Sequence, residues 1–106
     1  MKVLMNRELL ELFQTGRSRR YREVARNREL MAGFIRAVKT MMTVNDVDEL
    51  SRFSYLHYER LRHQWSGYSS VRLSNSYIHR VIFRETSDGL QVELIDIDDT
   101  HYGNKH

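Results

Sequence analysis

The 106-residue chain is long enough for one hydrophobic core but not for two, and we expect a single domain over residues 1–106. It contains no cysteine, which excludes disulfide bonds and thiolate metal sites. No apolar run is long enough to span a bilayer and no signal peptide is recognisable, so we expect a cytoplasmic protein without a membrane partner.

Arginine dominates the basic residues of the chain. The formal net charge is only +3, but 14 of the 17 basic residues are arginine, and five acidic residues gather near the C-terminus. Guanidinium groups stay charged and bind phosphate bidentately. Nucleic acid is therefore a natural partner. A surface that only solubilises a small protein is an equally open reading of the same composition.

The first half of the chain has the periodicity of helices. Met1–Leu4 is a short apolar segment that could form a first strand. A helix is expected from Asn6, which can cap its start, to Gly16, which can end it. A second helix is expected over Tyr21–Met42, where apolar residues recur at helical spacing.

The second half of the chain predicts β-strands. A turn and a short helix capped by Asn45 or Asp46 precede them. Four segments alternate between apolar and polar residues: Tyr55–Arg62, Gly67–Leu73, Tyr77–Glu85 and Leu90–Ile97. The turns between them are short, which implies antiparallel neighbours. The predicted fold class is α+β, with two N-terminal helices packed on one face of a small, curved, mainly antiparallel sheet.

Alternation along the strands separates a buried face of the sheet from an arginine face. A period of two sends successive side chains to opposite faces. The buried face is expected to hold Leu61, Val71, Leu73, Val81 and Phe83. The arginine face is expected to hold Tyr58, Arg60, Arg62, Tyr68, Ser70, Arg72, Arg80 and Arg84. In the last strand the apolar residues change phase between Leu94 and Ile95, which predicts a bulge or burial on both faces.

An open sheet face lined by arginines suits RNA cleavage. A base takes the proton from a 2′-hydroxyl, cations stabilise the charge on the phosphorane, and an acid protonates the leaving 5′-oxygen. Side chains that could hold the phosphate are Arg62, Arg72, Arg80 and Arg84, available proton carriers are His57, Glu59, His63, His101 and Tyr102, and Tyr58 and Tyr68 could stack on bases. Each of these also has a reading as an ordinary surface residue.

Other kinds of site are weakly indicated. His79 shares a strand face with Val81 and is expected in the core. Asp96, Asp98, Asp99 and His101 could chelate a divalent ion, but they lack the spacing of a calcium-binding loop. No nucleophile elbow, phosphate-binding loop or dinucleotide fingerprint occurs. We therefore expect neither a metal site nor a cofactor.

Four short stretches follow one another in the order of a known set of motifs. They are Leu4–Gly16 (LMNRELLELFQTG), which ends like Phe-x-Thr-Gly; Leu61–Leu73 (LRHQWSGYSSVRL), which is similar to Leu-Lys-Gly, four residues and aromatic-Ser-Ile-Arg-Val; His79–Phe83 (HRVIF), which is similar to aromatic-Arg-Ile-x-Phe; and Ile95–His101 (IDIDDTH), which is similar to a final strand ending Asp-Tyr-His. Together they resemble the RelE/ParE superfamily of bacterial toxins, and specifically its HigB branch. The resemblance implies a RelE-like fold, an mRNA endonuclease acting in the ribosomal A site, and a paired helix-turn-helix antitoxin of the HigA type.

The resemblance also implies roles for individual residues. Arg62 stands at the lysine of Leu-Lys-Gly, Arg80 at the arginine of aromatic-Arg-Ile, and His101 at the terminal histidine. Arg62 and Arg80 would stabilise the phosphate, and His101 would move protons with Tyr102 or Glu59 assisting. The residues expected to bind the RNA around this site are Arg60, Arg72, Arg84, Tyr58 and Tyr68.

The sequence departs from the family pattern where protons would be moved. Glu59 stands where HigB-type toxins often carry a histidine, Thr100 replaces the tyrosine before the last histidine, and His63 replaces the glycine. Two other functions are therefore kept open. One is a ParE-like toxin that inhibits gyrase and cleaves no RNA. The other is a family member that has lost catalysis and only binds RNA or its antitoxin.

Overall fold

A computed structural model describes residues 1–100 of the chain. The strands are β1 (Lys2–Met5), β2 (Glu59–Arg60), β3 (Ser69–Arg72), β4 (Arg80–Glu85) and β5 (Gln91–Asp98). The helices are α1 (Arg7–Thr15), α2 (Arg22–Arg26), α3 (Arg28–Thr43) and α4 (Val47–Leu50), with short 3₁₀ helices η1 (Ser54–Leu56) and η2 (His63–Trp65). None of the helices within residues 1–100 is long and apolar enough to cross a membrane.

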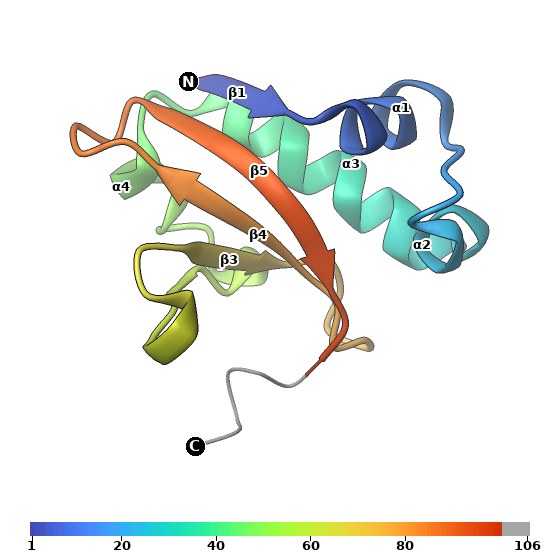
Figure 1. The fold of residues 1–106 in the computed structure, drawn as a ribbon. Helices are drawn as coiled ribbons and strands as arrows, with labels where there is room; N and C mark the ends of the chain where they lie inside the picture. Colours follow the sequence, from blue (N-terminus) through green and yellow to red (C-terminus); the bar gives the residue numbers. More distant parts are fainter. Residues whose placement is uncertain (101–106) are drawn as a thin grey trace.

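The strands form one sheet in the order β1-β5-β4-β3-β2 (Figure 1). β1 runs parallel to β5, and every other neighbouring pair is antiparallel. Helix α3 packs across one face and lies behind the sheet in Figure 1, so the opposite face is turned towards the viewer. The predicted α+β class, the mainly antiparallel sheet and the short first strand are confirmed. We call the face without α3 the open face.

The first helix begins and ends at the predicted residues. The side-chain oxygen of Asn6 accepts a hydrogen bond from the Leu9 amide at 2.9 Å, which satisfies one of the unpaired donors of the first turn. At the other end, Gly16 adopts the left-handed conformation (φ 73°) and donates its amide to the Leu12 carbonyl at 2.9 Å. These two caps fix α1 as a nine-residue element.

The single helix predicted over Tyr21–Met42 is wrong, because it breaks at Asn27. That residue has an extended backbone (φ −103°, ψ 114°), ends α2, and caps α3 by accepting a hydrogen bond from the Leu30 amide at 3.0 Å. An asparagine side chain offers the backbone this alternative to a continuous helix. The break leaves α2 as a five-residue turn that can take a direction different from α3.

Gly33 allows α3 to approach the sheet closely. A Cβ atom at this position would lie 1.8 Å from the carbonyl oxygen of Leu73, just beyond the end of β3. Real Cβ atoms do not come that near to backbone, so only glycine lets the helix lie here. The apparent weakness of a glycine within a helix is thus explained by tertiary packing.

The strand predicted over Tyr55–Arg62 is much shorter than expected. Its first part is the 3₁₀ helix η1, which buries Leu56, and His57 follows in the left-handed conformation (φ 48°). Only β2 remains extended and paired with β3. The short helix predicted after α3 is present as α4. Of its two predicted caps, Asp46 is the one observed, because its side chain accepts a hydrogen bond from the Glu49 amide at 2.8 Å.

The remaining strands follow the predicted alternation. Val71, Val81 and Phe83 are fully buried against the helices. The expected bulge is present, because the β4–β5 register shifts between Ile82 and Phe83, where β5 carries Ile95 as an extra residue. The strand predicted from Tyr77 begins later, at the start of β4.

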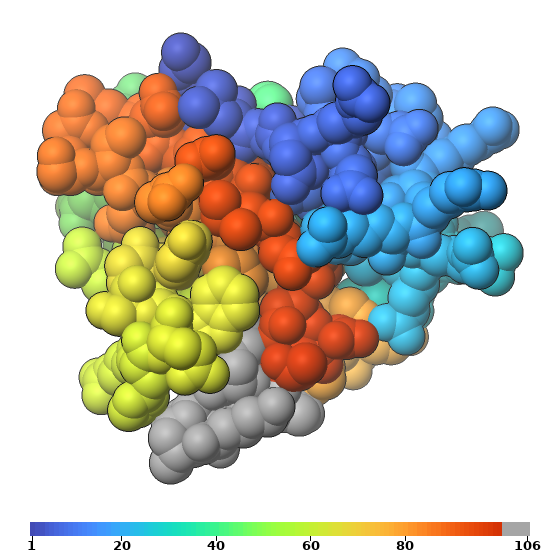
Figure 2. All heavy atoms as spheres, in the orientation of Figure 1, coloured from blue at the N-terminus to red at the C-terminus, as the bar shows by residue number. Residues whose placement is uncertain are grey.

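A second, smaller hydrophobic cluster lies on the open face. Leu61 and Ile82 are its buried members, and Trp65, Tyr68 and Ile95 pack around them partly exposed. Figure 2 shows this side with side chains filled in, where the β2–β3 region in yellow lies beside β5 in red. The cluster packs the segment that contains η2 against the sheet. The open face therefore has a packed hydrophobic part as well as a charged part.

Candidate nucleic-acid interface

Two arginines occupy directly opposed positions on the open face. Arg72 of β3 and Arg80 of β4 are register partners, so their side chains leave the sheet on the same side. Residues opposed in this way have Cβ atoms roughly 5 Å apart, and like charges there destabilise the pair. The arrangement concentrates positive charge at one point of the sheet, where the Glu59 carboxylate pairs with Arg80 and a further anion would relieve the remaining repulsion.

The guanidinium group of Arg80 is held in a defined orientation. Its Nε donates to Ser70 Oγ at 2.7 Å, and its Nη2 donates to the His57 carbonyl at 2.8 Å. Nη2 also forms an ion pair with Glu59 Oε1 at 3.2 Å. The Arg80 side chain is only 16% exposed. The contacts come from β2, β3 and the left-handed turn at His57, so three chain segments fix one cation.

Arg72 is only partly satisfied. Its Nη2 donates to the Tyr77 carbonyl at 3.3 Å, while its Nε is buried and has no hydrogen-bond partner within residues 1–100. A buried donor without a partner costs on the order of 1–3 kcal/mol. An oxygen-rich ligand on the open face could supply the missing acceptor.

The opposite end of the open face is aromatic. The Arg84 guanidinium carbon lies 5.8 Å from the centre of the Tyr68 ring, and its Nη2 pairs with Glu93 Oε1 at 2.9 Å. Trp65 packs edge-on against Tyr68, with ring centres 5.6 Å apart. Flat side chains next to cations are what unpaired RNA bases need for stacking.

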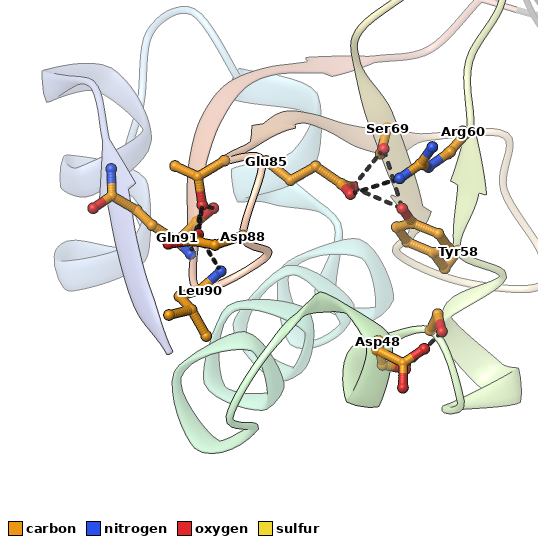
Figure 3. Close-up of polar contacts among 10 residues, drawn as sticks. Asp48, Tyr58, Arg60, Ser69, Glu85, Asp88, Leu90 and Gln91 are labelled. Atoms are coloured by element: carbon orange, nitrogen blue, oxygen red, sulfur yellow. Dashed lines mark hydrogen bonds and ion pairs between the residues drawn. The ribbon is translucent and has the colours of Figure 1, made fainter.

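Tyr58 and Arg60 do not lie on the open face, so their predicted placement is wrong. Figure 3 shows both gathered with Ser69 around Glu85, on the side of the sheet that bears the helices. Glu85 accepts from the Tyr58 hydroxyl at 2.7 Å, from Ser69 Oγ at 2.9 Å and from Arg60 Nη2 at 3.4 Å. Instead, Glu59 and Leu61 point to the open face, since Glu59 contacts Arg80 and Leu61 packs on Ile82.

Tyr58 is a stabilising residue of this cluster. Burial raises the pKa of Tyr58 above its usual range, so its hydroxyl stays protonated and donates to Glu85. Tyr58→Phe should lower the free energy of unfolding by about 1 kcal/mol, because Glu85 loses one of its donors. Urea denaturation measures this, with Tyr55→Phe as the control: its exposed hydroxyl contacts Thr40, and its removal should cost less than about 0.5 kcal/mol. Equal losses in the two variants would contradict the account.

The other predicted site residues are spread over the domain. Arg62 is exposed at the start of η2. His57 Nε2 lies 3.1 Å from Asn75 Oδ1, and His63 has a left-handed backbone (φ 60°). His101 and Tyr102 lie outside the described residues. The structure thus brings Arg72, Arg80 and Glu59 together.

One group of side chains could hold a metal ion in principle. Ligand atoms of Glu23, His79 and Asp99 lie within 4.8 Å of one another. However, His79 Nε2 already lies 2.6 Å from Glu23 Oε1, and its buried Nδ1 has no hydrogen-bond partner within residues 1–100. A ligating histidine normally donates its second N–H to an acceptor. His79 therefore faces Glu23 from the core, and the expected core histidine is confirmed at 7% exposure.

Comparisons with known proteins bear on the fold. No family model and no curated protein matches the sequence. Among solved structures, the YoeB/ParE toxin from Agrobacterium tumefaciens is similar with a TM-score of 0.53, over 94% of this chain and 99% of that one, at 16% sequence identity. The chain therefore shares the α+β fold of that toxin. The likeness does not distinguish a HigB-type member, which stays a prediction.

Two groups that hold Arg80 in place are not among the predicted site residues. Ser70 is fully buried and accepts from Arg80, and the His57 carbonyl accepts from the same group. Alternation placed Ser70 beside the arginines, so its position on the strand was the available signal. No pattern in the sequence indicated that a backbone carbonyl of a left-handed turn would point at Arg80.

Proposed function

We propose that this chain is the toxin of a toxin–antitoxin pair and that it cleaves mRNA in the ribosomal A site. The observation that supports the proposal is the Arg72–Arg80 pair beside Glu59 on the open face of a RelE/ParE fold. Two cations that face each other fit a phosphate, and a carboxylate next to them fits a proton acceptor. The partner would be a small helix-turn-helix antitoxin of the HigA type.

The cleavage step assigns a role to each group. Glu59 takes the proton of the 2′-hydroxyl, whose oxygen attacks the adjacent phosphorus. Arg80, oriented by Ser70, and Arg72 stabilise the extra negative charge on the phosphorane oxygens. The bond from phosphorus to the 5′-oxygen then breaks and leaves a 2′,3′-cyclic phosphate, while an acid protonates the departing oxygen. His101 and Tyr102 are the proposed acids.

Glu59 can be tested separately from Arg80. Glu59→Gln should slow cleavage by roughly 100-fold, because the amide cannot accept the proton. The matched control is Glu93→Gln, which removes the carboxylate that pairs with a third open-face arginine, Arg84, and should change the rate less than about threefold. Cleavage is followed on a defined message with ribosomes. Full activity of Glu59→Gln would assign Glu59 only to holding Arg80.

The function itself is tested by mapping transcript ends after brief induction of the protein in bacteria. The proposal expects new ends within translated codons for the wild type and none for Arg80→Ala. Growth arrest with DNA damage and no such ends would favour a gyrase inhibitor. If the folded protein, expressed without antitoxin, causes neither growth arrest nor new transcript ends, the result would favour a protein that only binds RNA or its antitoxin.

A further inference from the structure

A second concentration of arginines lies away from the open-face pair, in the connection between α1 and α2. A hollow of about 550 Å³ there is lined by Arg17, Arg19, Arg20, Arg22 and Arg26 against two glutamates, Glu8 and Glu11. All five guanidinium-bearing residues are exposed. Figure 2 shows this segment in light blue at the edge of the molecule, beside β5 in red. So many like charges repel one another unless a polyanion binds them.

Four of these five arginines have no counter-ion within the part of the chain that the structure describes. Arg20 pairs with Glu8 at 3.2 Å and with Asp96 at 3.7 Å. No ion pair joins Arg17, Arg19, Arg22 or Arg26 to any other residue within 1–100. Arg20 therefore ties the segment to β5, while the other four are available to a partner.

The segment is a built surface and not a loose loop. The Tyr21 amide donates to Ser18 Oγ at 2.9 Å, and the Tyr21 hydroxyl donates to Asp96 Oδ1 at 2.6 Å. The Arg17 amide donates to Thr15 Oγ1 at 3.1 Å, directly after the left-handed Gly16. These contacts hold the backbone in place, so binding would cost little ordering of the chain.

The chemistry of the surface favours a phosphate backbone over an acidic protein segment. Protein partners are usually anchored by apolar or aromatic side chains, and none of the exposed large hydrophobic residues lies between 16 and 26.

The chemistry of this surface also favours a duplex over a single strand. Unpaired bases need an aromatic platform, and the one aromatic residue of the segment, Tyr21, is buried at 6% exposure.

We propose that the α1–α2 arginines bind the phosphate backbone of double-stranded RNA, at a site distinct from the Arg72–Arg80 pair. Asp96 and Asp98 of β5 separate the two surfaces, since Asp98 is the register partner of Arg80 and Asp96 contacts Arg20. The choice of RNA over DNA rests on the proposed function, and under that function the duplex would be a helix of ribosomal RNA.

The test measures binding of an RNA duplex of about 16 base pairs at several salt concentrations. The variant Arg17→Gln, Arg19→Gln, Arg22→Gln removes three charges without breaking an ion pair within residues 1–100. Its affinity near physiological salt should fall roughly 10-fold to 100-fold, and the slope of log K against log salt should become shallower by about two to three. The control is Lys2→Gln, Arg36→Gln, Lys39→Gln, which removes three exposed charges on β1 and α3, also without breaking an ion pair within residues 1–100.

The outcomes separate this surface from the cleavage site. The Arg80→Ala protein should bind the duplex with unchanged affinity, whether or not the wild type cleaves RNA. Equal losses in the test and control variants would reduce the effect to net charge and overturn the proposal. So would unchanged binding by a folded test variant, or tighter binding of a polyglutamate peptide or a single strand than of the duplex.

Discussion

Arg80→Ala is expected to abolish transcript cleavage while the protein remains folded. Removing one preorganised donor to a developing oxyanion typically costs roughly 100-fold to 1,000-fold in rate. Arg80 should be at the upper end, because Ser70, the His57 carbonyl and Glu59 orient it before the RNA arrives. Arg80→Lys should recover little, since a lysine ammonium cannot reproduce the two directions in which the guanidinium donates.

Folding must be measured with the rate. The alanine variant leaves buried Ser70 without its donor, so the free energy of unfolding should fall by about 1–2 kcal/mol, which lowers Tm without unfolding the domain. Arg84→Ala is the matched control, because Arg84 lies on the same face and strand but is exposed and paired with Glu93. Its rate should stay within about tenfold of the wild type. A folded Arg80→Ala protein that cleaves normally would remove Arg80 from the site.

Gly33→Ala should destabilise the protein by about 2 kcal/mol or more. Helix propensity alone predicts the opposite, since alanine stabilises a helix interior by about 1 kcal/mol relative to glycine. The added Cβ would collide with the Leu73 carbonyl, which is backbone and cannot rotate away. Helix α3 would have to move off β3, and overpacking of this kind costs roughly 1–3 kcal/mol or more.

Denaturant unfolding of Gly33→Ala gives the sign of the effect directly. Ala32→Gly is the control on the neighbouring, exposed position of the same helix, where only propensity acts, with an expected loss of about 1 kcal/mol. A Gly33→Ala protein as stable as the wild type would show that α3 does not approach the end of β3 this closely.

The sequence predicted best where local chemistry and tertiary packing agree. Asn6 and Gly16 cap α1 as expected, and the phase change at Ile95 is a bulge. It predicted poorly where a polar side chain overrode a hydrophobic pattern. The stripe over Tyr21–Met42 continues through Asn27, but the Asn27 side chain starts a new helix there.

The error in the site has a different physical cause. The sheet was expected to bury apolar residues only towards the helices, so buried Leu61 was assigned to that face and Tyr58 and Arg60 to the other. The open face has its own hydrophobic cluster, and Leu61 packs there on Ile82. A period of two shows which residues share a face but not which face it is. Because the two faces of this segment are exchanged relative to the prediction, Glu59 lies on the open face and contacts Arg80.

The central claim is tested most directly with purified protein and ribosomes stalled with a known codon in an empty A site. The account predicts that the wild type cuts within that codon and leaves a 2′,3′-cyclic phosphate. It also predicts that Arg80→Ala does not cut and that the same message without ribosomes stays intact. Folded wild-type protein that leaves the A-site codon uncut, or that cuts free and ribosome-bound message alike, would contradict it.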